Sequence, residues 1–182
     1  MTMVYERPGT AQRLDLIRDF DDFPRPGITF KDLSPLLADP AGFAAAIEEM
    51  RSAFDGAEID AVVGIEARGF VFGAAVSVAL GVGFVPARKS GKLPGPTVRE
   101  CYELEYAEAC LEMQADAGIG GRAVLVVDDV LATGGTAAAA VRLVERLGGR
   151  VAGLAFVVEI SGLGGRKRLM GHNVLCVQEA GY

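Results

Sequence analysis

The feature that most constrains the fold is a run of five apolar residues, Ala123–Val127, followed at once by Asp128 and Asp129. A strand without a polar face has to be buried on both sides, as in a parallel sheet covered by helices. Further apolar runs alternate with helical patterns along the chain, at 61–65, 69–80, 83–87, 136–147, 153–158 and 174–177. This alternation predicts an α/β fold with a mostly parallel, twisted sheet flanked by helices.

The N-terminal part of the chain has a different character. We expect a short helix at Thr10–Phe20, a turn-rich aromatic segment at 22–31, and a helix at Pro40–Phe54. The length of 182 residues suits one domain, 1–182, in which about residues 1–40 form a separate N-terminal segment.

The alternation of strands and helices is interrupted by an insertion at about residues 89–121. It opens with Lys, Gly and Pro residues and then alternates around Tyr102, Leu104 and Tyr106. Ligands bind beyond the carboxyl ends of parallel strands, so a long insertion there predicts a flexible lid. An ordinary hairpin is the alternative reading of the same pattern.

Charge and hydropathy argue against a nucleic-acid-binding protein and against a membrane span. The net charge of −6 disfavours a nucleic-acid-binding protein, which needs a basic face. The uncharged stretch Gly69–Ala87 is interrupted by Gly81 and Gly83, so we expect a helix, a turn and a strand rather than a membrane span.

The N-terminal residues and the cysteines indicate in which cellular compartment the protein resides. Met1–Gly9 carries no apolar leader, which predicts a cytoplasmic protein. Cys101, Cys110 and Cys176 show neither disulfide-framework nor zinc spacing, so we expect free thiols in a reducing compartment.

The strongest candidate site follows the apolar run. Asp128 and Asp129 precede the glycine-rich segment Ala132–Thr136, which leads into an alanine-rich helix. Glycines let consecutive N–H groups face one anion, and the helix start adds the positive end of its dipole. The loop is neither a Walker A loop nor a dinucleotide fingerprint. The two carboxylates could accept hydrogen bonds from vicinal hydroxyls of a sugar, or bind a metal ion through water. A phosphate cradle next to acceptors for hydroxyls describes a site for ribose 5-phosphate.

The whole run Val126–Thr136 resembles the signature of the type I phosphoribosyltransferases. The segments at 22–37, 64–73, 88–97 and 102–106 are similar to adenine phosphoribosyltransferases, in that family's order and spacing. The resemblance covers most of residues 12–180 and implies formation of AMP and diphosphate from adenine and 5-phosphoribosyl 1-diphosphate.

The resemblance also implies roles for individual residues. Asp128 and Asp129 would hold the ribose hydroxyls. The 5-phosphate would be wrapped by the loop residues Ala132, Thr133, Gly134, Gly135 and Thr136. The diphosphate would be met by the cations Arg68, Arg88, Lys89 and Lys92, of which Arg88 can reach a neighbouring subunit's site.

The base and its proton complete the implied site. Phe30 would stack on adenine, while main-chain groups of Thr29 and Lys31 read its edge. Many relatives have Arg in place of Lys31 and a hydrophobic residue in place of Thr29, which makes base selectivity less firmly implied than the fold. Glu105, in the lid, would manage the proton lost by the attacking purine. Glu105 and Arg68 are the catalytic candidates.

The resemblance implies Mg²⁺ bound through the substrate and a homodimer, with no nucleic-acid or membrane partner. Two alternatives stay open. The enzyme could use another purine base. Alternatively, the chain could be a non-catalytic regulator that senses 5-phosphoribosyl 1-diphosphate, the activated sugar. A synthase that makes this sugar is disfavoured, because those chains are longer and no ATP-binding segment is visible.

Overall fold

The computed structural model describes residues 16–104 and 107–181. These residues fall into two compact units, which divide between Glu49 and Met50. The boundary falls inside a helix, nine residues beyond the limit of about residue 40 expected for the N-terminal segment. In chain order the elements are β1 (Arg18–Phe20), β2 (Phe30–Asp32), α1 (Ser34–Ala38), α2 (Pro40–Ser52), β3 (Ala61–Ile65), α3 (Gly69–Leu80), β4 (Gly83–Lys89), β5 (Thr97–Leu104), β6 (Ala107–Gln114), β7 (Ala123–Leu131), α4 (Gly135–Arg146), β8 (Arg150–Ile160), α5 (Gly165–Arg168) and β9 (Val174–Ala180).

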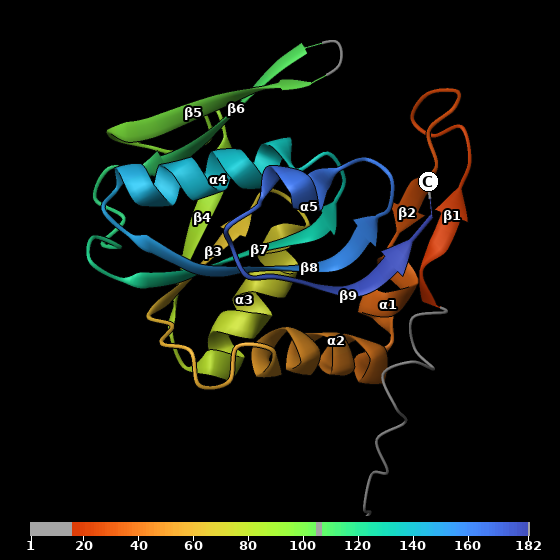
Figure 1. The fold of residues 1–182 in the computed structure, drawn as a ribbon, viewed down its shortest axis with the longest axis horizontal. Coiled ribbons are helices and arrows are strands. Elements are labelled where there is room, and N and C mark those ends of the chain that lie inside the picture. The colour runs from red at the N-terminus through yellow and green to blue at the C-terminus, as the bar shows by residue number, and fades with distance from the viewer. Residues whose placement is uncertain (1–15, 105–106, 182) are drawn as a thin grey trace, which may run out of the picture. The chain divides into compact units, whose positions relative to one another are not determined.

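The second unit is built on one seven-stranded sheet with the order β5-β6-β4-β3-β7-β8-β9. The five neighbouring strands β4, β3, β7, β8 and β9 run parallel to one another, while β6 pairs antiparallel with both β4 and β5. Helix α4 covers one face of the sheet and α3 the other (Figure 1). This architecture confirms the predicted α/β class.

Strand β7 explains why the sheet is covered twice. Val124 and Val126 belong to the buried cluster that also contains Leu143 of α4. Leu125 and Val127 point the other way, as alternation requires, and Val127 lies beside Gly73 of α3. Four successive apolar residues therefore lose contact with water, which stabilises the fold by about 1.5–3 kcal/mol for each fully buried large side chain.

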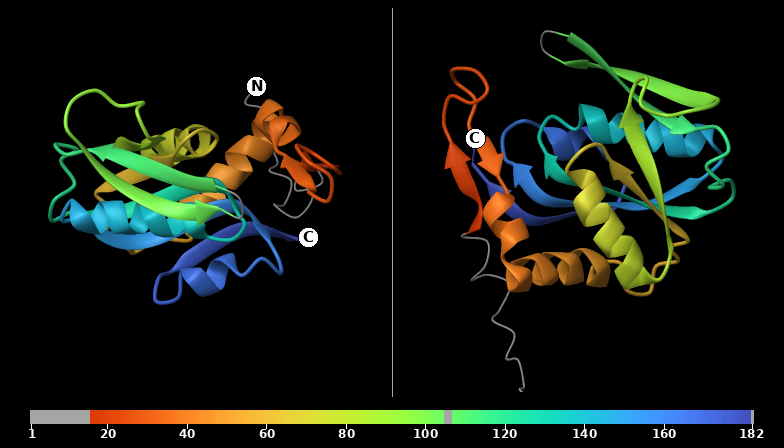
Figure 2. Two further views of the ribbon diagram at one scale, coloured as in Figure 1. Left: turned by 90° about the horizontal axis from the view of Figure 1, so that it is seen from above. Right: turned by 180° about the vertical axis from the view of Figure 1, so that it is seen from behind.

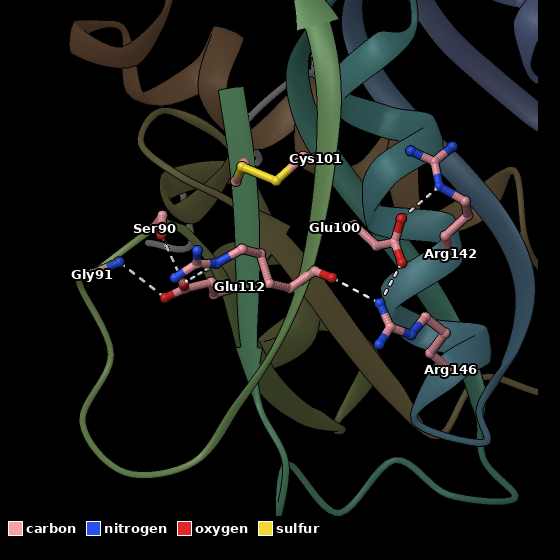
Figure 3. Close-up of a disulfide and its surroundings, with 9 residues drawn as sticks. Ser90, Gly91, Glu100, Cys101, Glu112, Arg142 and Arg146 are labelled. Atoms are coloured by element: carbon pink, nitrogen blue, oxygen red, sulfur yellow. Dashed lines mark hydrogen bonds and ion pairs between the residues drawn. A yellow bond between two sulfur atoms is a disulfide. The ribbon is translucent and has the colours of Figure 1, made fainter. Parts of the chain in front are cut away.

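The expected insertion is an antiparallel hairpin formed by β5 and β6, which extends the sheet beyond β4 and lies over α4 (Figure 2). Its strands are joined by a disulfide between Cys101 and Cys110, which are direct cross-strand partners (Figure 3). The expectation of free thiols was therefore wrong for these two. The nine-residue separation in the sequence gave no sign of pairing, because the hairpin register alone brings the two Cα atoms to 4.0 Å. Cys176 is free.

The first unit contains the short antiparallel pair β1–β2 and helix α1. The prediction of a helix at Thr10–Phe20 was wrong for its last three residues, because residues 18–20 form β1. Residues 10–15 of that prediction lie outside the described part of the chain. Cross-strand ion pairs favour strand β1, since Arg18 binds Asp32 at 2.7 Å and Lys31 binds Asp19 at 2.8 Å. Among the described residues, no helix is long and apolar enough to cross a membrane.

Candidate active site

The centre of the candidate site is the acidic pair at the carboxyl end of β7. Asp129 is buried, with 6% of its surface exposed, and its backbone N–H donates to Oδ1 of Asp128 at 2.9 Å. Burial, and then the neighbouring charge of Asp129, raise the pKa of Asp128 well above its ordinary value. The ionised form of Asp128 is therefore costly in the folded protein unless a ligand donates hydrogen bonds to it.

This cost predicts a pH-dependent gain in stability for Asp128→Asn. The ionised carboxylate is disfavoured in the folded state only, so stability falls as pH rises from the unfolded-state pKa, about 3.9, through the raised folded-state pKa. At pH 7 the free energy of unfolding of the variant should exceed that of wild type by roughly 0.5–2 kcal/mol, and this gap should shrink as the pH falls toward about 4. Thermal unfolding of both proteins from pH 4 to pH 8 measures it; a gap of constant size would contradict this account.

Arg68 lies in the turn between β3 and α3 and reaches the acidic pair. Its Nε is 2.5 Å from Oδ2 of Asp129, although this oxygen accepts no well-aligned hydrogen bond from the described residues. The approach depends on Gly69, because a Cβ there would lie 2.7 Å from Oδ1 of Asp128 and 2.9 Å from the carbonyl oxygen of Val127. The fold thus brings the predicted diphosphate residue against the predicted ribose residues.

The glycine-rich loop leads from β7 into α4, as the sequence predicted. Gly134 is the N-cap of α4 with φ of +77°, a conformation that favours glycine. No side chain caps this helix end and its first turn contains no acidic residue. The first amides of α4 therefore lack the usual capping acceptor, and the dipole of this twelve-residue helix favours an anion here. The other loop residues lie beside this end: Ala132, Thr133, Gly135 and Thr136.

The predicted cations Arg88 and Lys89 end β4, while Lys92 follows in the next loop. The guanidinium of Arg88 binds both carboxylate oxygens of Glu66, at 2.8 and 3.2 Å, and donates to the carbonyl oxygen of Lys92 at 3.0 Å. Glu66 also accepts the backbone N–H of Lys89 at 2.9 Å, and the hydrogen bond from Arg88 lowers the pKa of its carboxyl.

Sequence reasoning missed Glu66. The only available signal was its place two residues before Arg68, after a buried strand. Glu66 binds the guanidinium of Arg88 and the backbone N–H of Lys89, so it orients these two candidate diphosphate residues at the end of β4.

The hairpin is anchored at two points (Figure 3). The buried carboxylate of Glu112 accepts from Ser90 Oγ at 2.7 Å, from Gly91 N at 2.9 Å and from Arg99 Nε at 2.8 Å. These bonds lower the pKa of Glu112, the largest effect coming from the Gly91 N–H. The loop after Lys89 is thereby fixed to β6.

The other anchor joins the hairpin to the phosphate-loop helix. Glu100 of β5 accepts from Arg142 at 2.9 Å and from Arg146 at 2.5 Å, both on α4. Tyr102 packs near Gly135, where a Cβ would lie 3.2 Å from its Cδ2 atom. Glu105 and Tyr106, predicted for the lid, lie outside the described residues.

The predicted base-binding residues lie in the first unit, in and just before β2. Phe30 packs edge-on against Phe23 with ring centroids 5.2 Å apart. Thr29 Oγ1 donates to Asp21 at 3.0 Å, and Lys31 is buried with its ammonium on Asp19. With the side chains of Thr29 and Lys31 engaged in the unit itself, recognition of a base edge would fall to main-chain groups.

Comparison with known proteins agrees with this geometry. Residues 33–177 match the family model of the phosphoribosyl transferase domain. The adenine phosphoribosyltransferase of Roseobacter denitrificans is 53% identical over 169 residues, 91% of this chain and 96% of that protein.

Solved structures of the same family are similar over nearly the whole chain. The adenine phosphoribosyltransferase of Thermoanaerobacter pseudethanolicus has a TM-score of 0.91 at 45% identity, covering 94% of this chain and 100% of that one. The Saccharomyces cerevisiae enzyme, solved with an imino-altritol bisphosphate and adenine, has a TM-score of 0.86 at 40% identity, covering 92% and 97%. The similarity therefore extends over nearly the whole chain, and this chain belongs to the adenine phosphoribosyltransferase family.

Proposed function

We propose that the protein is an adenine phosphoribosyltransferase that forms AMP and diphosphate from adenine and 5-phosphoribosyl 1-diphosphate, a step of purine salvage. The observation that carries the proposal is the meeting of three groups at one edge of the sheet. These are the acidic pair, Arg68 and the uncapped start of α4. Together they offer acceptors for sugar hydroxyls, a cation for a diphosphate and a cradle for a phosphate.

Adenine is the proposed base. The relative from Saccharomyces cerevisiae was solved with adenine, and one from Giardia lamblia, 38% identical, with 9-deazaadenine. In this chain Phe30 would stack on the ring, and the main-chain groups of Thr29 and Lys31 would read its edge.

The reaction is a displacement at the anomeric carbon. The C1–oxygen bond breaks and the diphosphate leaves with the electron pair, while N9 of adenine forms the new bond from the opposite face. Arg68 and Lys89 would stabilise the charge that develops on the leaving group, with Arg88 and Lys92 beside them. Glu105 would accept the proton that the base loses, and the lid would exclude water from the activated sugar.

The proposed cofactor is Mg²⁺, carried by the substrate. In residues 16–104 and 107–181 no group of three or more His, Cys, Asp or Glu side chains gathers to hold a metal alone. Mg²⁺ keeps several waters and binds substrate phosphates readily, so the diphosphate and the ribose hydroxyls would hold the ion, while Asp128 and Asp129 hold those hydroxyls. When bound, the ion neutralises charge on the diphosphate.

We also propose a homodimer in the cytoplasm. The exposed side chain of Val78 on α3, with 81% of its surface accessible, is an apolar group that a partner subunit could cover. The disulfide of the hairpin is uncommon in a reducing compartment. Trapping of free thiols in living cells would show whether it forms there.

A steady-state assay against adenine, hypoxanthine, guanine and xanthine tests the function. We expect AMP formation with adenine, little product with the other bases, and loss of activity on chelation that added Mg²⁺ restores. Preference for another base would favour a different purine phosphoribosyltransferase. Binding of the activated sugar without turnover of any base would favour the regulator.

A further inference from the structure

Helix α5 lies directly against the phosphate loop, although 29 residues separate Gly165 from Thr136 in the sequence. A Cβ on Gly134 would lie 2.7 Å from the carbonyl oxygen of Gly165 and 3.3 Å from Cβ of Arg168. A Cβ on Gly165 would overlap the carbonyl oxygen of Ala132. Two glycines thus allow the loop and α5 to touch through their backbones.

This contact places a cation at the start of α4. Nη1 of Arg168 lies 3.1 Å from the position of a Cβ on Gly135, the first residue of that helix. The side chain is exposed, and no ion pair or hydrogen bond of its guanidinium is found within the described part of the chain. Its neighbour Arg166 behaves differently, because it binds Glu159 at 2.6 Å and the carbonyl oxygen of Val174 at 2.9 Å.

The arrangement favours the binding of an anion. The start of a helix carries partial positive charge, and the first turn of α4 has no acidic residue to balance either this charge or Arg168. A dianionic phosphate bound by the loop amides would balance both. Arginine also suits phosphate oxygens geometrically, because its planar fork of N–H groups can donate two parallel hydrogen bonds.

We propose that Arg168 is a further 5-phosphate-binding residue, which reaches from α5 over the phosphate loop. The assignment rests on the proposed function, since it takes the loop to hold the phosphomonoester of the substrate. The group it binds takes no part in bond making or breaking and is unchanged from the activated sugar to AMP. Arg168 therefore acts by uniform binding, which affects KM for the sugar and the affinity for AMP but not kcat.

The test compares Arg168→Gln with Lys167→Gln, which removes an exposed cation from the same helix. For Arg168→Gln we expect KM for the activated sugar and Kd for AMP to rise together, each about tenfold, as for loss of one charged hydrogen bond. The kcat and the KM for adenine should stay within about twofold. Arg168→Lys should recover part of the affinity, and Lys167→Gln should behave as wild type.

Binding measurements separate this assignment from the function itself. Calorimetric titration with ribose 5-phosphate needs no turnover, and adenosine, which lacks the phosphate, should bind wild type and Arg168→Gln equally. Weaker ribose 5-phosphate binding in the variant supports the role of Arg168 even if wild type forms no AMP. Equal ribose 5-phosphate affinity in the two proteins, or a loss confined to kcat or to diphosphate affinity, would overturn it.

Discussion

Asp129→Asn is expected to lower kcat/KM for AMP formation by on the order of 10²–10³-fold, as when one preorganised electrostatic contact is removed from an active site. The variant loses a charge that lies 2.5 Å from Nε of Arg68 and an acceptor at the place proposed for the ribose hydroxyls. An amide of the same shape keeps the volume but turns one oxygen into a donor that faces the guanidinium. Steady-state kinetics with varied activated sugar measure the loss.

A matched control is Asp55→Asn. Asp55 forms an exposed ion pair with Arg51 at 2.7 Å, and such pairs contribute about 0–1 kcal/mol to stability. Its activity should equal that of wild type. If Asp129→Asn kept activity within threefold of wild type while both variants were folded by circular dichroism, the role of the acidic pair would have to be abandoned.

Gly69→Ala is expected to have the second large effect, although it changes no charge. The added Cβ would lie 2.9 Å from the carbonyl oxygen of Val127 and 3.0 Å from Cα of Asp128, both backbone atoms of the central strand. Since β7 is buried and cannot yield, the start of α3 has to move, and Arg68 moves with it. A displacement of about 1 Å at such a site can cost about 10²-fold in rate.

The same substitution should also destabilise the fold. Overpacking of this kind costs about 1–3 kcal/mol, which lowers Tm by several degrees in a protein of this size. Gly83→Ala is the matched control, because a Cβ at the exposed start of β4 meets no atom within 4 Å. Wild-type activity in Gly69→Ala, or an equal loss in Gly83→Ala, would show that the close approach does not matter.

Much of the fold was predictable because its patterns are local. Helix α3 was predicted with its observed bounds, and the strands at 61–65, 83–87 and 123–127 were each found at their predicted start. β4 and β7 continue past their apolar runs, through Lys89 and Leu131, because pairing with neighbouring strands carries polar residues along. Apolar periodicity marks where a strand is buried and does not mark where its hydrogen bonding ends.

The α/β class and the phosphate loop could be predicted from the amino-acid pattern alone. These depend on which residues are apolar and on the order Asp128, Asp129, Gly134 along one segment. Contacts between side chains of distant segments became visible only in the folded molecule. Glu66 binds Arg88 22 residues away, Cys101 pairs with Cys110 through the hairpin register, and Arg168 reaches the loop from α5. The physical reason is that such contacts depend on crossovers and strand register, and a single glutamate, cysteine or arginine carries no mark of its partner.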